Sequence, residues 1–263
     1  MYIDVILTHK NITPQAVERK NCVVIDTLRA TSTIITAFAH GCREIVPVKN
    51  AATAFRLKRR RAYQDYILAG EREGYCIENF QMGNSPQEYS NDRLKGKGII
   101  FCTTNGTKAL IKTKKARATV ICALLNVKTV AQWLRTQCFD TVICCAGTGG
   151  SYSMEDFLTA GRLVGYLQEK NGFLFSDLAS TAAFVYENIK EKSSGKNSFY
   201  EVFKNTANGK KLLAAGLESD IKYCAQEDIF PLLPIFKNGS IALQENPPIE
   251  DPIRGEDSIH GID

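Results

Sequence analysis

Apolar runs of strand length alternate with helix-like segments over the first 145 residues, and this alternation restricts the fold more than any other feature. Several runs are apolar at consecutive positions, which is typical of strands covered by helices on both faces. The alternation and the short connections indicate an α/β sheet. The predicted strands are residues 2–7, 22–26, 44–48, 66–69, 98–102, 118–122 and 141–145. The predicted helices between them are residues 31–40, 51–63, 86–93, 107–114 and 127–137.

The hydrophobic pattern of the sequence changes at Met154, after which almost every segment has a helical periodicity. The predicted helices there are residues 154–170, 177–191, 198–206, 209–216 and 219–226. Asn238-Gly239 in "LLPIFKNGSIAL" predicts a two-residue hairpin turn. We therefore expect a three-layer α/β/α domain over residues 1–244 with a largely parallel or mixed sheet. It would be strand-rich in 1–150 and helix-rich in 151–244, with a short C-terminal hairpin. Residues 245–263 form an acidic, Pro-containing tail that is expected to be flexible.

Four predicted strands run into turns that are rich in polar residues and Gly, and ligands of open α/β sheets bind beyond the carboxyl ends of strands. In "VVIDTLRATSTII", Asp26, Arg29, Thr31, Ser32 and Thr33 crowd the turn between a strand and a helix. Hydroxyls, a guanidinium and free helix N–H groups together favour a phosphate or similar anion. Helix capping would account for one hydroxyl, but not for an acid beside Arg29.

The other turns have similar alternatives. "AGEREG" places Glu71 beside Arg72, which is either part of the same site or a solvated ion pair. "GNSP" has the form of a helix start capped by Ser85, which leaves Asn84 free. "TTNGT" and "CAGTGG" are either donor-rich ligand turns or plain Gly-bearing connections, and "CAGTGG" does not match the dinucleotide fingerprint. "MEDF" places two acids in a first helical turn, as dipole partners or metal ligands.

Composition and motif spacing exclude several classes of protein. Hydrophobic content of 44%, charged content of 23% and a net charge of +5 are ordinary for a globular chain, so neither nucleic acid nor a membrane is an expected partner. No signal peptide or membrane-length apolar run is seen, and the nine cysteines are expected to be reduced in a cytoplasmic protein, mostly in the core. The haloacid-dehalogenase, tyrosine-phosphatase, histidine-phosphatase and Walker motifs are all absent.

The motifs "VVIDTLRATSTI", "GER", "GNSP", "TTNGT", "LLN", "CAG" and "ED" occur in this order, and at similar spacing, in the 2-phosphosulfolactate phosphatase family. The chain resembles that family over about residues 1–243. Its enzymes are named for the coenzyme M pathway, and they hydrolyse the phosphate ester of 2-phospho-3-sulfolactate to 3-sulfolactate and phosphate with Mg²⁺. Two departures are Cys102, where the family usually has Thr, and Asn79, where it usually has Gly.

The resemblance implies a set of site residues at matching positions. These are Asp26, Arg29, Thr31, Ser32, Glu71, Arg72, Asn84, Ser85, Thr103, Thr104, Asn105, Gly106, Asn126, Gly147, Glu155 and Asp156. Asp26, Arg29 and Glu71 are the expected catalytic residues, and the Mg²⁺ ligands are sought among Asp26, Glu71, Glu155 and Asp156. The others are expected to bind the small anionic substrate. No histidine lies in a motif, so Asp26 is expected to act as general base or as nucleophile.

Two other functions remain open from the residues alone. A non-catalytic binder of a phosphorylated or sulfonated metabolite would need the anion donors, but not so many acids on the same turns. A phosphoryl transferase or isomerase acting on phosphosugars would need both the anion donors and the acids. The apolar helical half also leads us to expect a homo-oligomer.

Overall fold

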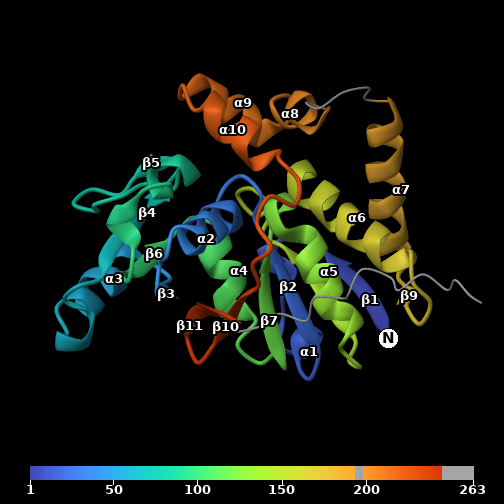
Figure 1. Ribbon diagram of the computed structural model, residues 1–263, viewed down its shortest axis with the longest axis horizontal. Helices are drawn as coiled ribbons and strands as arrows, with labels where there is room; N and C mark the ends of the chain where they lie inside the picture. The colour runs from blue at the N-terminus through green and yellow to red at the C-terminus, as the bar shows by residue number, and fades with distance from the viewer. Residues whose placement is uncertain (193–197, 245–263) are drawn as a thin grey trace, which may run out of the picture.

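The computed structural model describes residues 1–192 and 198–244, so the acidic tail lies outside the described residues. An eleven-stranded sheet with the order β5-β4-β6-β3-β11-β10-β7-β2-β8-β1-β9 forms the centre of the molecule (Figure 1). The strands are β1 Tyr2–Ile6, β2 Asn21–Ile25, β3 Glu44–Pro47, β4 Ile67–Arg72, β5 Tyr75–Cys76, β6 Gly98–Cys102, β7 Ala118–Cys122, β8 Thr141–Cys145, β9 Leu174–Phe175, β10 Pro234–Lys237 and β11 Ser240–Leu243.

Apart from β5, which pairs antiparallel with β4 at one edge, the sheet consists of two parallel groups joined by the C-terminal hairpin. β4, β6 and β3 are parallel to one another, as are β7, β2, β8, β1 and β9. β10 pairs with β7, and β11 meets β3 through the single pair Ile241–Ile45, both antiparallel. Three successive antiparallel pairings mean that the two groups run in opposite senses along the ladder. The expected mixed sheet is confirmed.

The predicted hairpin turn is also confirmed. Asn238 and Gly239 have φ of +54° and +88°, the left-handed conformations that a two-residue turn of this kind requires. Lys237 pairs directly with Ser240 on either side of the turn. This short hairpin therefore fills the gap between the two parallel groups.

Helices cover both faces of the larger parallel group, which confirms the three-layer arrangement. One face packs against α1 Pro14–Val17, α2 Ala30–Ala39 and α4 Gly106–Lys112. The other face packs against α5 Val127–Arg135, α6 Met154–Gln168 and α7 Asp177–Lys192. The strands contribute consecutive buried residues to these two cores, as their apolar runs predicted.

Three short helices form a cover above the sheet. α8 Ser198–Phe203, α9 Ala207–Ala214 and α10 Glu218–Cys224 lie together at the top of Figure 1. Their apolar side chains pack with Leu28, Leu124 and Leu158 from the sheet layer and α6. The cover, α8–α10, thus rests directly on the turn that follows β2.

Some local predictions were wrong. The helix expected at 86–93 is two 3₁₀ turns, Pro86–Tyr89 and Asp92–Leu94, separated because the Asn91 side chain accepts from the Arg93 N–H and starts a new cap. The helix expected at 51–63 ends earlier, because α3 covers Ala51–Lys58 and is followed by a 3₁₀ turn at Arg61–Tyr63. β5 and β9 were missed because two-residue strands have no periodicity to detect.

The two departures from the family pattern have simple structural settings. Asn79 adopts a φ of +61°, a left-handed conformation that glycine and asparagine tolerate better than other residues. Cys102 is the last residue of β6 and is fully buried in the core beside β4, where a small apolar side chain fits.

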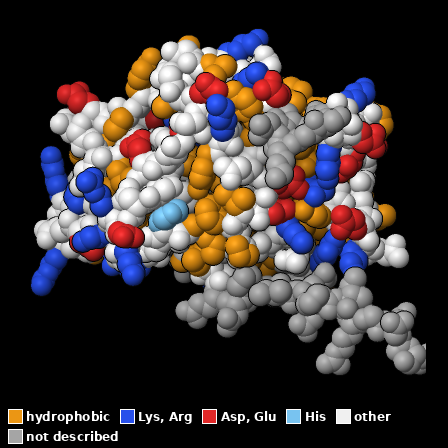
Figure 2. All heavy atoms as spheres, turned by 45° about the horizontal axis from the view of Figure 1, so that its top comes forward, with side chains coloured by type: hydrophobic (Ala, Val, Ile, Leu, Met, Phe, Trp, Pro, Cys, Tyr) orange, Lys and Arg blue, Asp and Glu red, His pale blue; other side chains and the backbone are white. Residues whose placement is uncertain are grey.

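All nine cysteines are free thiols. The five that the sequence placed in apolar strand runs are buried: Cys22, Cys102, Cys122, Cys144 and Cys145. In the described residues, no helix has the length and apolar character needed to span a membrane. Figure 2 shows acidic and basic side chains intermixed on the face that includes the cover.

Candidate active site

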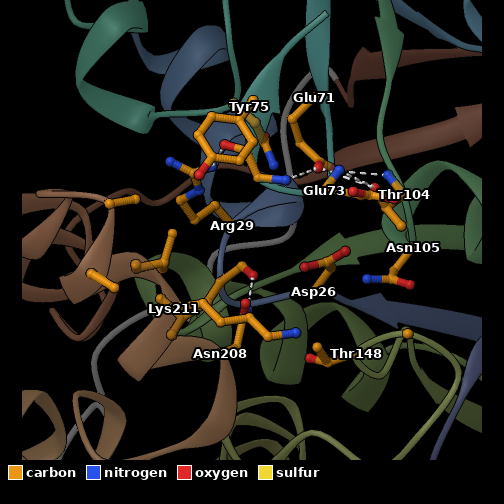
Figure 3. Close-up of a pocket in the computed structure, with 17 residues that line it drawn as sticks. Asp26, Arg29, Glu71, Glu73, Tyr75, Thr104, Asn105, Thr148, Asn208 and Lys211 are labelled. Atoms are coloured by element: carbon orange, nitrogen blue, oxygen red, sulfur yellow. Dashed lines mark hydrogen bonds between the residues drawn. The ribbon is translucent and has the colours of Figure 1, made fainter.

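A cavity of about 670 Å³ lies between the strand-end turns and the cover (Figure 3). The turns after β2, β4, β6 and β8 contribute to it, as does α9 of the cover. Its polar and charged side chains are Asp26, Arg29, Glu71, Glu73, Tyr75, Asn84, Thr104, Asn105, Thr148, Asn208 and Lys211. The cavity has the size of a small-metabolite site.

Asp26 follows the last residue of β2 and is only 7% exposed. Burial, followed by the negative charge of Glu71, raises the pKa of Asp26 to about 7, while hydrogen bonds from the backbone N–H groups of Ala30 and Gly106 lower it. A Cβ on Gly106 would lie 2.7 Å from Asp26 Oδ2 and 2.6 Å from Ala30 Cβ. Glycine at 106 is therefore what allows the start of α4 to approach the Asp26 carboxyl group.

Arg29 is held by the cover rather than by Asp26. Its Nη1 donates to Asp220 Oδ2 of α10 at 2.6 Å, and both side chains are almost completely buried. Nη2 donates to the Gly74 carbonyl at 3.3 Å, and Ser85 Oγ donates to the other Asp220 oxygen at 2.6 Å. This network fixes the guanidinium at the cavity wall and joins α10 to two turns of the sheet layer.

Glu71 connects the β4 turn to the β6–α4 turn. Its carboxylate accepts from the Thr104 N–H at 2.6 Å, from Thr104 Oγ1 at 3.0 Å and from the Gly74 N–H at 2.8 Å. Figure 3 shows these bonds on the side of the cavity that also carries Glu73 and Tyr75. Three donors preorganise this carboxylate next to Asp26.

Asp156 and Glu155, both sought as metal ligands, are buried behind the cavity wall and do not line it. Asp156 accepts from the Thr27 N–H at 2.9 Å and from the Gly147 N–H at 3.0 Å, so it clamps the β2 turn to the β8 turn. Burial, then the charges of Asp26 and Glu155, hold the pKa of Asp156 well above its usual range. Burial also raises the pKa of Glu155, whose Oε1 has no hydrogen-bond partner in the described chain.

The hydroxyls that open α2 face the backbone instead of the cavity. Asp26 N–H donates to Thr31 Oγ1, Ser32 Oγ donates to the Thr27 carbonyl, and Thr33 Oγ1 donates to the Asn84 carbonyl. All three side chains are fully buried. The N–H groups of Ala30 and Thr31 are taken by Asp26 itself. Thr31 and Ser32 were expected to present hydroxyls to an anion, but both are fully buried, bond to the backbone of their own turn and do not line the cavity.

Of the remaining residues that were predicted to bind the substrate, some line the cavity and others do not. Asn84, Thr104 and Asn105 line the cavity, and Asn84 and Asn105 each have a buried side-chain oxygen without a partner in the described residues. The others do not line it: Arg72, Ser85, Thr103, Gly106, Asn126 and Gly147.

Arg72 is exposed and points to the Cys102 sulfur at 3.9 Å. Thr103 bonds with Thr107 across the start of α4. Asn126 is fully buried, and its amide joins the Ala123 N–H to the Ile121 and Leu232 carbonyls. Thr103 and Asn126 therefore stabilise the turns, and neither they nor Arg72 line the cavity where substrate contact was expected.

Sequence reasoning missed the contributions of the helical half. Asp220, Asn208 and Lys211 come from α10 and α9, more than 180 residues after the β2 turn. Glu73 and Thr148 were also missed, although they lie within "AGEREG" and "CAGTGG", as was Tyr75, which directly follows "AGEREG". The helical segments show no motif spacing, so only the polar positions of an otherwise amphipathic helix could have drawn attention to Asn208 and Lys211.

The cavity wall contains more negative than positive side chains. Asp26, Glu71 and Glu73 face two cations, Arg29 and Lys211, and Arg29 is already paired. The described residues include no group of three His, Cys, Asp or Glu side chains placed to hold a metal ion. A single cation bound by one or two carboxylates and the amide oxygens of Asn105 or Asn84 remains compatible with this wall.

Comparison with known proteins points to one family. The family model described as 2-phosphosulpholactate phosphatase matches residues 6–239. A protein of Caldanaerobacter subterraneus subsp. tengcongensis is 38% identical over 94% of this chain and 100% of its own length. One from Clostridium acetobutylicum is 39% identical over 92% of this chain and 100% of its own, and one from Thermotoga maritima is 36% identical over 88% and 95%. All three are named probable 2-phosphosulfolactate phosphatase.

Proposed function

The chain belongs to the 2-phosphosulfolactate phosphatase family, and we propose that it hydrolyses 2-phospho-3-sulfolactate to 3-sulfolactate and phosphate. The observation that carries the proposal is the Asp26 carboxyl group, buried at a strand end and facing a cavity of small-metabolite size. Its pKa, raised to about 7, suits a group that accepts a proton near neutral pH.

The reaction needs one oxygen nucleophile at phosphorus and one departing alkoxide. Asp26 either takes a proton from the attacking water or attacks phosphorus itself, to give an acyl phosphate that water then cleaves; in both routes the departing alkoxide takes up a proton from water to become the hydroxyl of the product. Arg29 lies on the same wall and supplies charge-assisted hydrogen bonds to phosphate oxygens. The Asp220 carboxylate holds the guanidinium in position before the substrate binds, so less reorganisation is needed during the reaction.

Mg²⁺ is part of the proposal because of the charge of the site. A phosphate, a carboxylate and a sulfonate on one small molecule would meet more acids than bases on the cavity wall. Asp26 and the partnerless side-chain oxygen of Asn105 offer the hard donors that Mg²⁺ prefers, and Figure 3 places the two side chains near each other. When bound there, Mg²⁺ would neutralise charge on the phosphate oxygens.

The activity is tested by measuring phosphate release from 2-phosphosulfolactate with and without Mg²⁺, and by identifying the products by ³¹P NMR. We expect free phosphate and 3-sulfolactate. Phosphate moved within the substrate or to another acceptor would indicate a transferase or isomerase. Binding without any release would indicate a binding protein, and faster release from an unrelated phosphomonoester would refute the proposed substrate.

Metal binding can be tested without turnover. We expect Mg²⁺ to raise the melting temperature of the wild-type protein, and Asn105→Ala or Asp26→Asn to reduce that rise. Asp92→Asn, a change at an exposed acid, should leave the rise intact. If Mg²⁺ raised the melting temperature of all four proteins equally, Asp26 and Asn105 would not be ligands of the cation.

A further inference from the structure

Lys211 differs from Arg29, the other cation of the cavity wall, in the partners of its side chain. Among the described residues, Arg29 has Asp220 and Gly74 as partners, and Glu71 has Thr104 and Gly74. Lys211 forms neither an ion pair nor a side-chain hydrogen bond with any described residue, and it is exposed to the cavity. It is therefore the one cation of this wall that remains available for a ligand.

The helix that carries Lys211 is anchored above the catalytic turn. Asn208 precedes Lys211 by three positions, so both side chains occupy the same side of α9. Asn208 Nδ2 donates to the Leu28 carbonyl at 2.6 Å, next to Arg29. In Figure 3 the two residues lie across the cavity from Glu71, Glu73 and Tyr75, with Asp26 between. This anchor fixes where the Lys211 side chain enters the cavity.

The proposed substrate carries a sulfonate as well as a phosphate, and the position of Lys211 suits this further negative group. A sulfonate is a strong acid that stays ionised at any physiological pH and accepts hydrogen bonds through three oxygens. In a cavity with an excess of carboxylates it would be repelled unless a cation faced it. The ammonium group of Lys211 offers three donors and a compact charge for such a group.

We propose that Lys211 is the specificity-determining residue that binds the sulfonate of the substrate, while the phosphate lies at Asp26 and Arg29. This inference rests on the proposed function, because it assigns one group of that substrate to one residue. The cover thus recognises the end of the substrate that does not react, and the strand-end turns carry out the chemistry.

Two lysines of α9 supply a matched pair for the test. Lys210 is adjacent and exposed, and it does not line the cavity. Lys211→Met and Lys210→Met remove the same charge from the same helix and keep most of the apolar stem. Each would be assayed with 2-phosphosulfolactate and with 2-phospholactate, which has the same phosphate and carboxylate but lacks the sulfonate.

We expect Lys211→Met to raise KM for 2-phosphosulfolactate by roughly 10- to 100-fold, the usual loss for a charged hydrogen bond, with kcat changed less than about threefold. Its KM for 2-phospholactate should stay within about twofold of wild type. Lys210→Met should leave KM for both substrates within about twofold of wild type. Lys211→Arg should keep most of the wild-type affinity for the sulfonated substrate.

Equal rises in KM for both substrates would show that Lys211 binds the phosphate or carboxylate. An unchanged KM for both would show that Lys211 does not bind the substrate. Failure of the proposed function is a separate result, seen when wild-type protein does not hydrolyse 2-phosphosulfolactate. The inference is then decided by calorimetry with 3-sulfolactate and lactate. We expect Lys211→Met to weaken the binding of 3-sulfolactate but not that of lactate. Equal affinity of the wild-type protein for the two ligands would refute the proposed role of Lys211.

Discussion

The strand-end turns and the α8–α10 cover contribute to the cavity in opposite ways. Among the turns, Asp156 holds Thr27 and Gly147, Glu71 holds Thr104, and the α2 hydroxyls hold the backbone. The cover also has internal side-chain bonds, such as those of Tyr200 with Glu218 and of Thr206 with the Gly209 N–H, but toward the sheet layer it presents Asp220 to Arg29 and Lys211 to the cavity. The difference teaches that a motif dense in polar residues can serve mainly to fix its own geometry. The groups left free to meet a ligand can come from a segment without a motif.

The largest expected effect is that of Asp26→Asn, which removes the charge at the centre of the turns. We expect kcat to fall roughly 100-fold or more, because neither proton transfer nor nucleophilic attack survives. Burial and Glu71 raise the pKa of Asp26 from 3.8 to about 7, so the folded protein retains a proton there that the unfolded chain loses. The stability contribution of this group therefore falls as pH rises between about 4 and 7.

The same variant should consequently be more stable than wild type at pH 8 in the absence of divalent cations. We expect its melting temperature to rise by roughly 3–10 °C there, and the difference to shrink toward pH 4. Asp92→Asn is the control for removal of an exposed acid. Near-normal kcat at saturating Mg²⁺ would move the catalytic role to Glu71 and leave Asp26 as a cap for α2 and α4.

Gly106→Ala tests how tightly the turns are packed around that carboxyl group. The new Cβ would lie 2.7 Å from Asp26 Oδ2 and 2.6 Å from Ala30 Cβ, so one of these groups must shift. A misplacement of about 1 Å can cost up to about 100-fold in rate, and we expect a loss of about 10- to 100-fold in kcat. Gly165→Ala in α6 is the control, because its Cβ would meet only the end of the Glu187 side chain at 3.4 Å. Activity equal to that of the control would show that the turn is not rigid.

The sequence predicted the parts of the molecule that depend on local pattern. β6, β7 and β8 were predicted to the residue, because apolar runs bounded by turn residues have clear ends. The polar turns predicted that Asp26, Glu71, Thr104 and Gly147 converge at one site; the first three line one cavity, whereas Gly147 does not line it and its N–H donates to Asp156. The hairpin could be recognised because Asn238-Gly239 is a local turn signal.

Other parts depend on long-range packing and could not be predicted. The insertion of the hairpin between two parallel groups is set by pairing across more than 100 residues. Asp220 meets Arg29 across 191 positions, and no spacing in the sequence indicates that contact. Thr31 and Ser32 were misjudged for a related reason: a hydroxyl that bonds its own turn and one that faces a ligand are identical in sequence.

Asp220→Asn tests the cover where it holds the catalytic turn. The change keeps the shape of the side chain but leaves the Arg29 guanidinium without its buried counter-charge. We expect KM and the inhibition constant of inorganic phosphate to rise together by about 10-fold, with kcat changed less than about threefold. Ser85→Ala removes the other hydrogen bond of Asp220 and should cause a smaller rise. Unchanged KM well below the melting temperature would reduce Asp220 to a structural tether of α10.

Ser32→Ala has the smallest expected effect on activity, and it separates the two regions most clearly. Ser32 Oγ donates to the Thr27 carbonyl at 2.8 Å and is fully buried within the turn. Its removal leaves that carbonyl without this donor, which should cost about 1–3 kcal/mol of folding free energy. KM and kcat should both stay within about twofold of wild type. Denaturant melts and initial rates on the same preparation provide the measurement. A tenfold rise in KM with unchanged stability would show that the hydroxyl does reach the substrate, and the turns would then bind the anion as well as position Asp26.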